Sequence, residues 1–451
     1  MRGAARIVAR PSQAGRARLR LGPQAFVRPT TMSVFFVFLL AGYLALKLWL
    51  SERQIRYVAA HARQVPAQFA ATIELDDHQR AASYTIAKQR LAMLQALVAA
   101  AVFLALTWGG GLQRLYEALG AVLGRTLWLD LALVSCVVAL FGVMDLPFEW
   151  WRQFRIEQRF GFNRMSQALF FADALKSLLV GAALGLPLLA AVLYLMGSGG
   201  PFWWLGAWVL WAIFSLVLSV AYPWLIAPIF NRFSPLGDEV LLQRIGRLLE
   251  RTGFRSRGVY TMDGSRRSTH GNAYFTGLGA AKRIVFYDTL MERLRPDEIE
   301  AVLAHELGHF RLHHVIKGIA SGLAIALVWL ALLGWVQGRP GFAAALGVAS
   351  GTQAPSDGLV LVLFGMVMPL VSFLLAPLRS ALSRRHEFAA DAFAAQHASA
   401  DSLIRALCKL YQDNAATLTP DPVHSIFYDS HPPASIRINR LLASAPATAS
   451  A

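Results

Sequence analysis

The hexapeptide Ala304-His305-Glu306-Leu307-Gly308-His309 contains the spacing H-E-x-x-H. On a helix, residues i and i+4 share one face, so the imidazoles of His305 and His309 can bind a single zinc ion. Glu306 projects close by and can take a proton from water that the metal has made more acidic. The motif therefore predicts a hydrolytic zinc site. The alternative is a helix with two histidines and a solvated glutamate.

A catalytic zinc needs a third protein ligand and one open position for water. Two further histidines, His313 and His314, follow closely in the sequence. However, Leu312 and Val315 stand where the pattern H-E-x-x-H-x-x-G-x-x-H requires Gly and His, which excludes the three-histidine subclass. We expect His313 and His314 to lie at a membrane interface instead.

A second cluster, Ser383-Arg-Arg-His-Glu-Phe-Ala-Ala-Asp391, offers carboxylates for the third ligand. Glu387 and Asp391 are also i and i+4 on a predicted helix, so both can face the same point. One of them can bind zinc while the other accepts the free N–H of a zinc-bound histidine. The alternative is a pair of ordinary surface carboxylates. His386 should face elsewhere and be structural.

The elements that must position these side chains are unusually apolar. Of the 451 residues, 56% are hydrophobic and 16% are charged, whereas a soluble domain carries roughly 25% charged residues. Seven apolar runs approach the length of about 20 residues that a membrane-spanning helix needs; they lie near 32–50, 91–108, 127–147, 174–197, 202–230, 316–337 and 357–377. Buried helices of a soluble core are seldom uncharged on all sides, which disfavours that alternative. Pro223 and Pro228 should kink the fifth run near its end.

The net charge of +16 indicates topology better than it indicates nucleic-acid binding, and no nucleic-acid partner is expected. Lys and Arg stay on the cytoplasmic side of membrane proteins. Of the 43 basic residues, 32 follow the first, third, fifth and seventh runs, 10 lie in the N-terminal tail or follow the others, and Lys47 lies within the first run. This predicts a cytoplasmic zinc domain. Residues 1–31 conflict with it, because they hold seven Arg and no acid. They can be a targeting peptide, a genuine basic arm, or an untranslated extension before a start at Met32, which we favour.

Two soluble blocks interrupt the apolar runs on the predicted cytoplasmic side, so they can meet in one domain. The first block should contain a helix from Gly237 to Thr252, two short strands and a helix that starts at Pro296 and can continue into the sixth run. The predicted domains are an N-terminal extension (1–31), five membrane helices (32–230) and the first part of the zinc domain (231–315). Two membrane helices (316–377), the second part of the zinc domain (378–442) and a disordered tail (443–451) follow. The two cysteines give no disulfide framework.

From Met32 to about Leu442, the chain resembles the type I CAAX prenyl endopeptidase family of integral-membrane zinc metallopeptidases. Several motifs carry this resemblance in order: Arg159-Phe-Gly-Phe-Asn163, Phe233-Ser-Pro-Leu-Gly237, Ser265-Arg-Arg-Ser-Thr-His-Gly-Asn-Ala-Tyr-Phe275, Lys282-Arg-Ile-Val285, His305 to His309, Ser383-Arg384 with Glu387 to Asp391, and Ser430-His-Pro-Pro433 with Arg437. Residues 1–31 have no counterpart in the family pattern, which favours the Met32 start.

The resemblance implies a mainly α membrane protein. Seven transmembrane helices would enclose a chamber, which a cytoplasmic α+β zinc metallopeptidase domain of the glutamate-ligand, gluzincin-like type would close. The resemblance also implies roles for nine residues. His305, His309 and Glu387 would be the ligands of one Zn²⁺ per chain, Glu306 the base and Asp391 the partner of a ligand histidine. His431 and Arg437 would lie near the metal and stabilise an oxyanion, and Asn272 and Ala273 would form part of the substrate cleft. By sequence alone, His431 before two prolines would more often be a structural loop residue.

The implied function is a membrane-embedded zinc metalloendopeptidase. The alternative is a membrane transporter or scaffold with a non-catalytic zinc site, which Glu306 disfavours because a structural site would be closed by a fourth ligand. We expect a monomer among membrane lipids that acts on a peptide or protein, with membrane-associated or lipidated substrates included. The Ala/Arg-rich composition favours a bacterial inner membrane. Eukaryotic family members trim prenylated C-terminal tripeptides, but a general role in cleaving membrane-associated or misfolded proteins is equally open.

Overall fold

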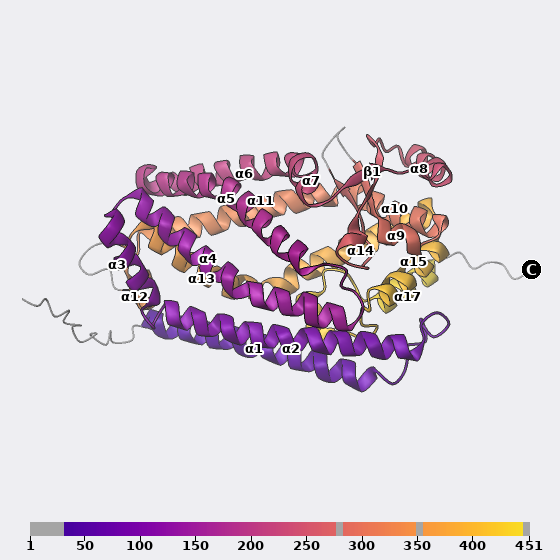
Figure 1. Cartoon of the computed structure of the whole chain (residues 1–451), viewed down its shortest axis with the longest axis horizontal. Coiled ribbons are helices and arrows are strands. Elements are labelled where there is room, and N and C mark those ends of the chain that lie inside the picture. Colours follow the sequence, from indigo (N-terminus) through magenta and orange to yellow (C-terminus); the bar gives the residue numbers. More distant parts are fainter. Residues whose placement is uncertain (1–30, 277–282, 349–354, 445–451) are drawn as a thin grey trace, which may run out of the picture.

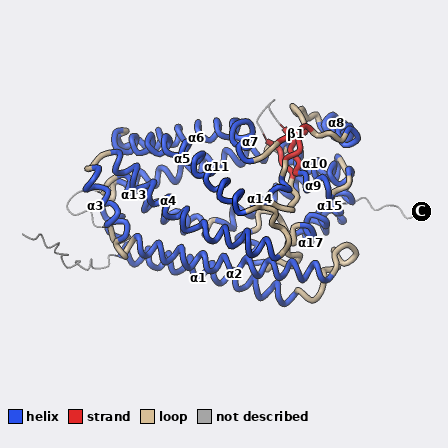
Figure 2. The backbone as a smooth tube through the Cα atoms, viewed as in Figure 1, coloured by secondary structure: helices blue, strands red, loops and turns tan. Residues whose placement is uncertain are grey.

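The computed structural model describes residues 31–276, 283–348 and 355–444. The expectations for the N-terminal extension and for residues 445–451 lie outside this part. Long helices run side by side along the molecule, and the strands gather at one end of it (Figures 1 and 2). The molecule therefore has a helical body and a smaller mixed region at one end.

Among the described residues, seven helical spans are long and apolar enough to cross a membrane, as the sequence predicts. They are α1 (Thr31–His61), α2 (Leu75–Leu106), α4 (Leu127–Trp151) with the π-helical turn η1 (Arg152–Glu157), α5 (Gln167–Ser198), α6 (Trp203–Ala221) with its flanking turns, α11 (His314–Gln337) and α13 (Asp357–Leu374). Their outer faces carry large apolar side chains such as Phe38, which is 71% exposed, and Val328, which is 65% exposed. Apolar side chains all round a helix are typical of contact with lipid.

The fifth span breaks where its prolines predict. After the 3₁₀ turn η2 (Gly200–Phe202), α6 runs to Ala221 and is followed by the π-helical turn η3 (Tyr222–Ile226) and the short helix α7 (Ala227–Phe230). Pro223 and Pro228 lack the N–H that a regular helix needs, so the hydrogen-bond pattern changes there. At the other end of the molecule, α3 (Gly111–Leu123) and α12 (Pro340–Ala345) connect the spans.

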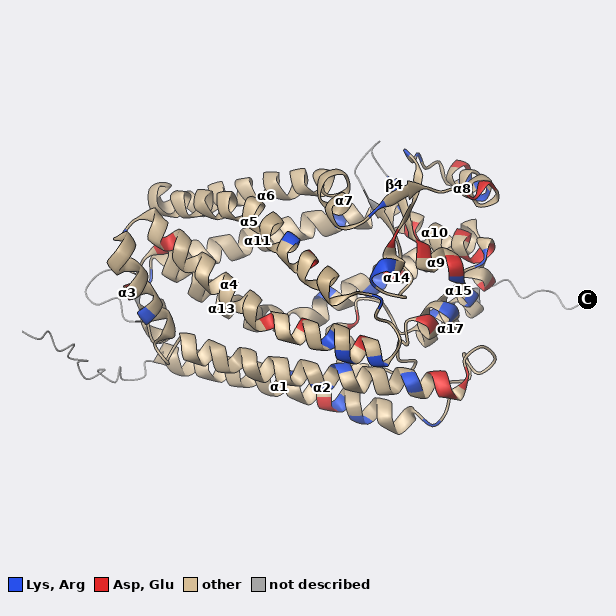
Figure 3. Ribbon diagram, viewed as in Figure 1, with Lys and Arg blue, Asp and Glu red and all other residues tan. Residues whose placement is uncertain are grey.

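The charged side chains gather at the end that holds the strands, whereas α6 carries none along its length (Figure 3). Water solvates charged groups well and hydrocarbon does not. The separation therefore places the mixed region in an aqueous phase and the body of the bundle in the membrane.

The mixed region is built on a four-stranded sheet of the order β1-β2-β4-β3 within the described residues. Its strands are β1 (Phe233–Pro235), β2 (Val259–Met262), β3 (Ala273–Thr276) and β4 (Arg283–Tyr287). β2 and β4 are parallel, with Val259 opposite Ile284, and β3 runs antiparallel to β4, with Ala273 opposite Phe286. β3 thus lies at an edge of the sheet.

Helices pack beside this sheet and on one another, and they complete the core of the region. They are α8 (Glu239–Thr252), α9 (Asp288–Arg293), α10 (Pro296–Arg311), α14 (Ala376–His397), α15 (Ala400–Asp413), α16 (Pro422–Tyr428) and α17 (Ala434–Ser444), with the 3₁₀ turn η4 (Gly264–Arg266). The fully buried side chains of Leu248, Phe286 and Leu303 belong to one hydrophobic cluster that joins α8, the sheet and α10. The two soluble blocks of the sequence therefore form one domain, because α14 and α15 come from the second block and pack on α10.

The end of α10 differs from the sequence prediction. α10 does not continue into the sixth span: it ends at Arg311, and α11 begins at His314. Between them His313 adopts a left-handed conformation with a φ angle of 59°. That conformation is uncommon for residues other than glycine, although Asn, Asp and His adopt it more often than the rest. The sequence has neither glycine nor proline at this point, which is why the break was missed.

Gly308 allows α10 and α14 to approach closely. A Cβ atom placed on Gly308 would lie 3.0 Å from Ala390 Cα and 3.1 Å from Phe393 Cβ. Gly308→Val is therefore expected to push the two helices apart and to lower the free energy of unfolding by about 1–3 kcal/mol. Thermal unfolding in detergent measures this, with Gly246→Ala on α8 as the control, because no atom of the described residues lies within 4 Å of its Cβ position. An unchanged melting temperature in Gly308→Val would contradict the close packing.

Candidate metal centre

Three side chains from two helices converge at the centre of the domain. His305 and His309 lie one turn apart on α10, and their Nε2 atoms are 3.2 Å apart. Glu387 reaches them from α14, with Oε1 3.3 Å from His309 Nε2 and Oε2 3.5 Å from His305 Nε2. One potential ligand atom from each of the three lies within 4.8 Å of the others. His305 and Glu387 are buried.

The chemistry of these groups fits a zinc ion. Two imidazole nitrogens and one carboxylate are a usual ligand set for catalytic zinc. Glu387 Oε2 is buried, and its contacts among the described residues, with His305 Nε2 at 3.5 Å and Arg437 Nη1 at 3.8 Å, are longer than a good hydrogen bond. Burial would raise the pKa of Glu387, but hydrogen bonds from His305 and His309 hold it well below its usual range. A buried, charged carboxylate with an oxygen that has only long contacts is suited to a cation.

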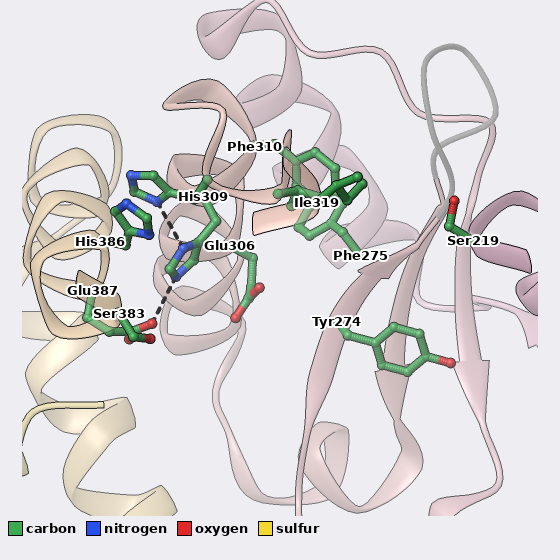
Figure 4. Close-up of a pocket in the computed structure, with 12 residues that line it drawn as sticks. Ser219, Tyr274, Phe275, Glu306, His309, Phe310, Ile319, Ser383, His386 and Glu387 are labelled. Carbon is green, nitrogen blue, oxygen red and sulfur yellow. Dashed lines mark hydrogen bonds and ion pairs between the residues drawn. The ribbon is translucent and has the colours of Figure 1, made fainter. Parts of the chain in front are cut away.

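The convergent groups open onto a cavity of about 460 Å³. Figure 4 shows His309, His386 and Glu387 on one side, Tyr274 and Phe275 on the other, and Glu306 between the two groups. The described residues that line it are Ser219, Tyr274, Phe275, Glu306, His309, Phe310, His314, Val315, Ile319, Ser383, His386 and Glu387. Burial raises the pKa of the Glu306 carboxyl above its ordinary value. This brings Glu306 closer to the range in which a carboxylate can both take and return a proton.

Asp391 holds the far nitrogen of His305. Its Oδ1 lies 2.9 Å from His305 Nδ1, so Nε2 of the same ring faces Glu387 and His309. The buried Arg437 donates from Nε to Asp391 Oδ2 at 2.8 Å and from Nη2 to Oδ1 at 2.6 Å. Burial would raise the pKa of Asp391, but hydrogen bonds from His305 and Arg437 hold it below its usual range.

His431 and Arg437 occupy different surroundings, although the sequence places both near the metal. His431 lies between α16 and α17, its side chain is 63% exposed, and its Nε2 is 3.4 Å from Glu387 Oε1. Arg437 is buried beside the carboxylates, with Nη1 3.8 Å from Glu387 Oε2. Neither is among the lining residues of the cavity.

The predicted cleft residues lie at the start of the edge strand. Asn272 precedes β3, its Oδ1 accepts a hydrogen bond from Ala273 N, and its backbone oxygen accepts one from Tyr287 N. Ala273 opens the strand. The next two residues, Tyr274 and Phe275, line the cavity, whereas Asn272 and Ala273 do not.

Two histidines have a closer relation to the centre than the sequence suggested. His386, which the sequence predicts to face away from the site, lines the cavity. His314 lines it too, and it also begins the sixth membrane span. The Nδ1 atoms of His314 and His309 are 3.1 Å apart. The ring of His386 stacks on that of His314, with centroids 4.0 Å apart. The sequence signals the contact between His314 and His309 only weakly, because the contact depends on the left-handed conformation of His313.

Known proteins resemble the chain along most of its length. Residues 54–232 match the family model described as CAAX prenyl protease N-terminal, five membrane helices, and residues 235–445 match Peptidase family M48. A CAAX prenyl protease 1 homolog of Arabidopsis thaliana is 33% identical over 84% of this chain and 90% of the relative. A CAAX prenyl protease 1 homolog of Mus musculus is 31% identical over 87% of this chain and 92% of the relative. The crystal structure of S. mikatae Ste24p superposes with a TM-score of 0.85 at 26% identity, over 91% of this chain and 99% of that one.

The fold, the site and these matches define a membrane-embedded zinc metallopeptidase. Within that class, the chain belongs to the type I CAAX prenyl endopeptidase family. Peptide or protein substrates and a membrane environment follow from this membership.

Proposed function

We propose that this chain cleaves peptide bonds with His305, His309 and Glu387 as its three zinc ligands and with Glu306 as its general base. The observation that carries the proposal is the convergence of the three donor side chains, from α10 and α14, beside the cavity into which Glu306 projects. The open side of the cavity leaves room for water and a peptide.

In the proposed mechanism, Glu306 moves the proton. Its carboxylate accepts a proton from the attacking water and delivers it to the nitrogen of the leaving amine. Zinc, when bound, supplies a Lewis acid that acidifies water and polarises the scissile carbonyl. Asp391 fixes the ring of His305 through Nδ1, and Arg437 holds Asp391 in that position.

His431 is the better candidate for stabilising the oxyanion of the tetrahedral intermediate. Arg437 is buried, and two of its nitrogens donate to Asp391. His431 is largely exposed and has its Nε2 next to Glu387. An N–H donor that faces the reacting carbonyl can stabilise its developing negative charge. We therefore assign Arg437 a positioning role and His431 the oxyanion contact.

For the substrate, we propose an extended peptide that pairs with the edge strand β3 at Asn272 and Ala273. An unpaired strand edge offers backbone groups to such a peptide. The relatives are named CAAX prenyl proteases, which supports a lipidated C-terminal segment as the substrate, with membrane-associated or misfolded proteins as the alternative. We further propose that the seven spans enclose a chamber and that the protein acts as a monomer without nucleic acid.

We place the zinc domain on the cytoplasmic side of a bacterial inner membrane. The distribution of Lys and Arg supports this orientation. In a Cys136→Ser background, Arg440→Cys on α17 should react with a membrane-impermeant maleimide only after cells are opened. Labelling of Arg440→Cys in intact cells would show that the zinc domain lies on the opposite side of the membrane.

The function is tested with the purified full chain in detergent. We expect one zinc per chain by metal analysis, cleavage of a farnesylated peptide that ends in a CAAX sequence, loss of cleavage with 1,10-phenanthroline and recovery with added zinc. An unprenylated peptide of the same sequence separates lipid recognition from general proteolysis. Zinc-loaded protein that cleaves neither peptide would favour the transporter or scaffold alternative, and chelator-resistant cleavage would contradict the mechanism.

A further inference from the structure

The two histidines of the centre have different partners at their far nitrogens. A metal-binding imidazole generally donates its other N–H to a fixed acceptor, which sets the tautomer and the orientation of the ring. For His305 that acceptor is the carboxylate of Asp391. For His309, the Nδ1 atom lies 3.1 Å from Nδ1 of His314, the partner found for it among the described residues.

This contact depends on the break between α10 and α11. On an uninterrupted helix, a residue five positions further on would lie about 140° around the axis from His309. Here α10 ends at Arg311, and the left-handed conformation of His313 redirects the chain before α11 begins. The side chain of His314 thereby returns to His309, and His314 is only 8% exposed.

The ring of His314 is itself held in place from α14. His386 stacks on it with the ring centroids 4.0 Å apart and the planes inclined by 12°. His386 directly precedes Glu387 in the sequence. The helix that provides the third donor side chain therefore also fixes the group behind His309.

We propose that His314 is a positioning residue for His309. The proton on His309 Nδ1 is donated to His314 Nδ1, so His309 Nε2 is left free to face His305 and Glu387. Only one proton can lie between two Nδ1 atoms, so His314 accepts in its neutral form with its own proton on Nε2. This inference rests on the proposed assignment of His309 as a zinc ligand.

Two substitutions at position 314 distinguish the effect of the hydrogen bond from the effect of ring packing. His314→Phe keeps a ring that can stack on His386 but has no acceptor. His314→Asn loses the ring but places Oδ1 on Cγ, where the acceptor Nδ1 stands in histidine. His313→Asn is the matched control, because asparagine tolerates the left-handed conformation and His313 does not line the cavity.

The readout is the rate at which zinc leaves the purified protein in the presence of a chromophoric chelator, which requires no activity. His314→Phe should release zinc about 10- to 100-fold faster than the wild type. His314→Asn should stay within about threefold of the wild type, and so should His313→Asn, since each retains the acceptor. If His314→Phe fails to fold, as judged by thermal unfolding of the zinc-free proteins, His314→Leu takes its place.

Two outcomes would overturn the inference. One is a folded His314→Phe that releases zinc at the wild-type rate. The other is a His314→Asn that releases it as fast as His314→Phe, because restoring an acceptor at this position would then have no effect on zinc release. His309→Ala distinguishes these failures from failure of the proposed function: if that variant binds zinc as tightly as the wild type, the ligand assignment itself is wrong.

Discussion

Glu306→Gln is expected to keep one zinc per chain and to lose peptide cleavage by about three orders of magnitude, within the range typical of a lost general acid–base group. Glutamine has nearly the same shape as glutamate, so the cavity around it is retained. Its neutral amide has no carboxylate to take a proton from water. Because Glu306 does not belong to the convergent group of His305, His309 and Glu387, zinc binding should be unaffected.

The measurement is kcat/KM for a CAAX-type peptide, together with zinc content by metal analysis of the same preparation. Glu300→Gln is the matched control, because Glu300 also lies on α10 but pairs with Arg244 and Arg251 away from the centre. The control should retain most of its activity. Cleavage by Glu306→Gln at a rate close to that of Glu300→Gln would remove Glu306 from the mechanism.

The membrane spans were predictable because the membrane imposes a simple requirement. A spanning segment must satisfy its backbone internally and expose apolar side chains, so length and composition identify it. The ends of the helices were less predictable. The first apolar run stops near residue 50, whereas α1 continues to His61. Residues 51–61 are polar enough to leave the hydrocarbon, but nothing in them ends a helix. Within them, Arg53 and Gln54 bind Asp421 at the start of α16, a contact between distant segments that the sequence does not signal.

In the candidate site, the features set by local sequence were predictable, and those set by long-range packing were not. The spacing of His305 and His309 is set by helix geometry, so five residues of sequence suffice to place them on one face. Their approach to Glu387 depends on packing between segments about 80 residues apart, which Gly308 permits. The contact of His314 depends on one left-handed residue with no glycine or proline to signal it, and only the structure reveals it.

Glu387→Ala is expected to weaken zinc binding by on the order of 10²–10³-fold and to abolish cleavage with it. The substitution leaves two imidazoles and removes the one negative charge among the described residues that contacts both of them, while Arg437 Nη1 remains nearby. A zinc ion would then have two protein ligands beside a cation. Competition with a fluorescent zinc chelator measures the affinity, and thermal unfolding of the zinc-free protein checks that the domain still folds.

Comparison with Asp391→Asn decides which of the two carboxylates binds zinc, because the sequence alone allows either of them to be the ligand. Asparagine can still accept the N–H of His305 through its amide oxygen, although the ion pair with Arg437 is lost. We expect Asp391→Asn to weaken zinc binding by about 10- to 100-fold, as is typical when a group behind a ligand is altered. The smaller effect at Asp391 follows from geometry: its carboxylate lies at Nδ1 of His305, on the far side of the ring from the Nε2 atom that faces Glu387. If Asp391→Asn lost more affinity than Glu387→Ala, the two carboxylates would have to exchange roles, and His305 would have to present the opposite nitrogen to the metal.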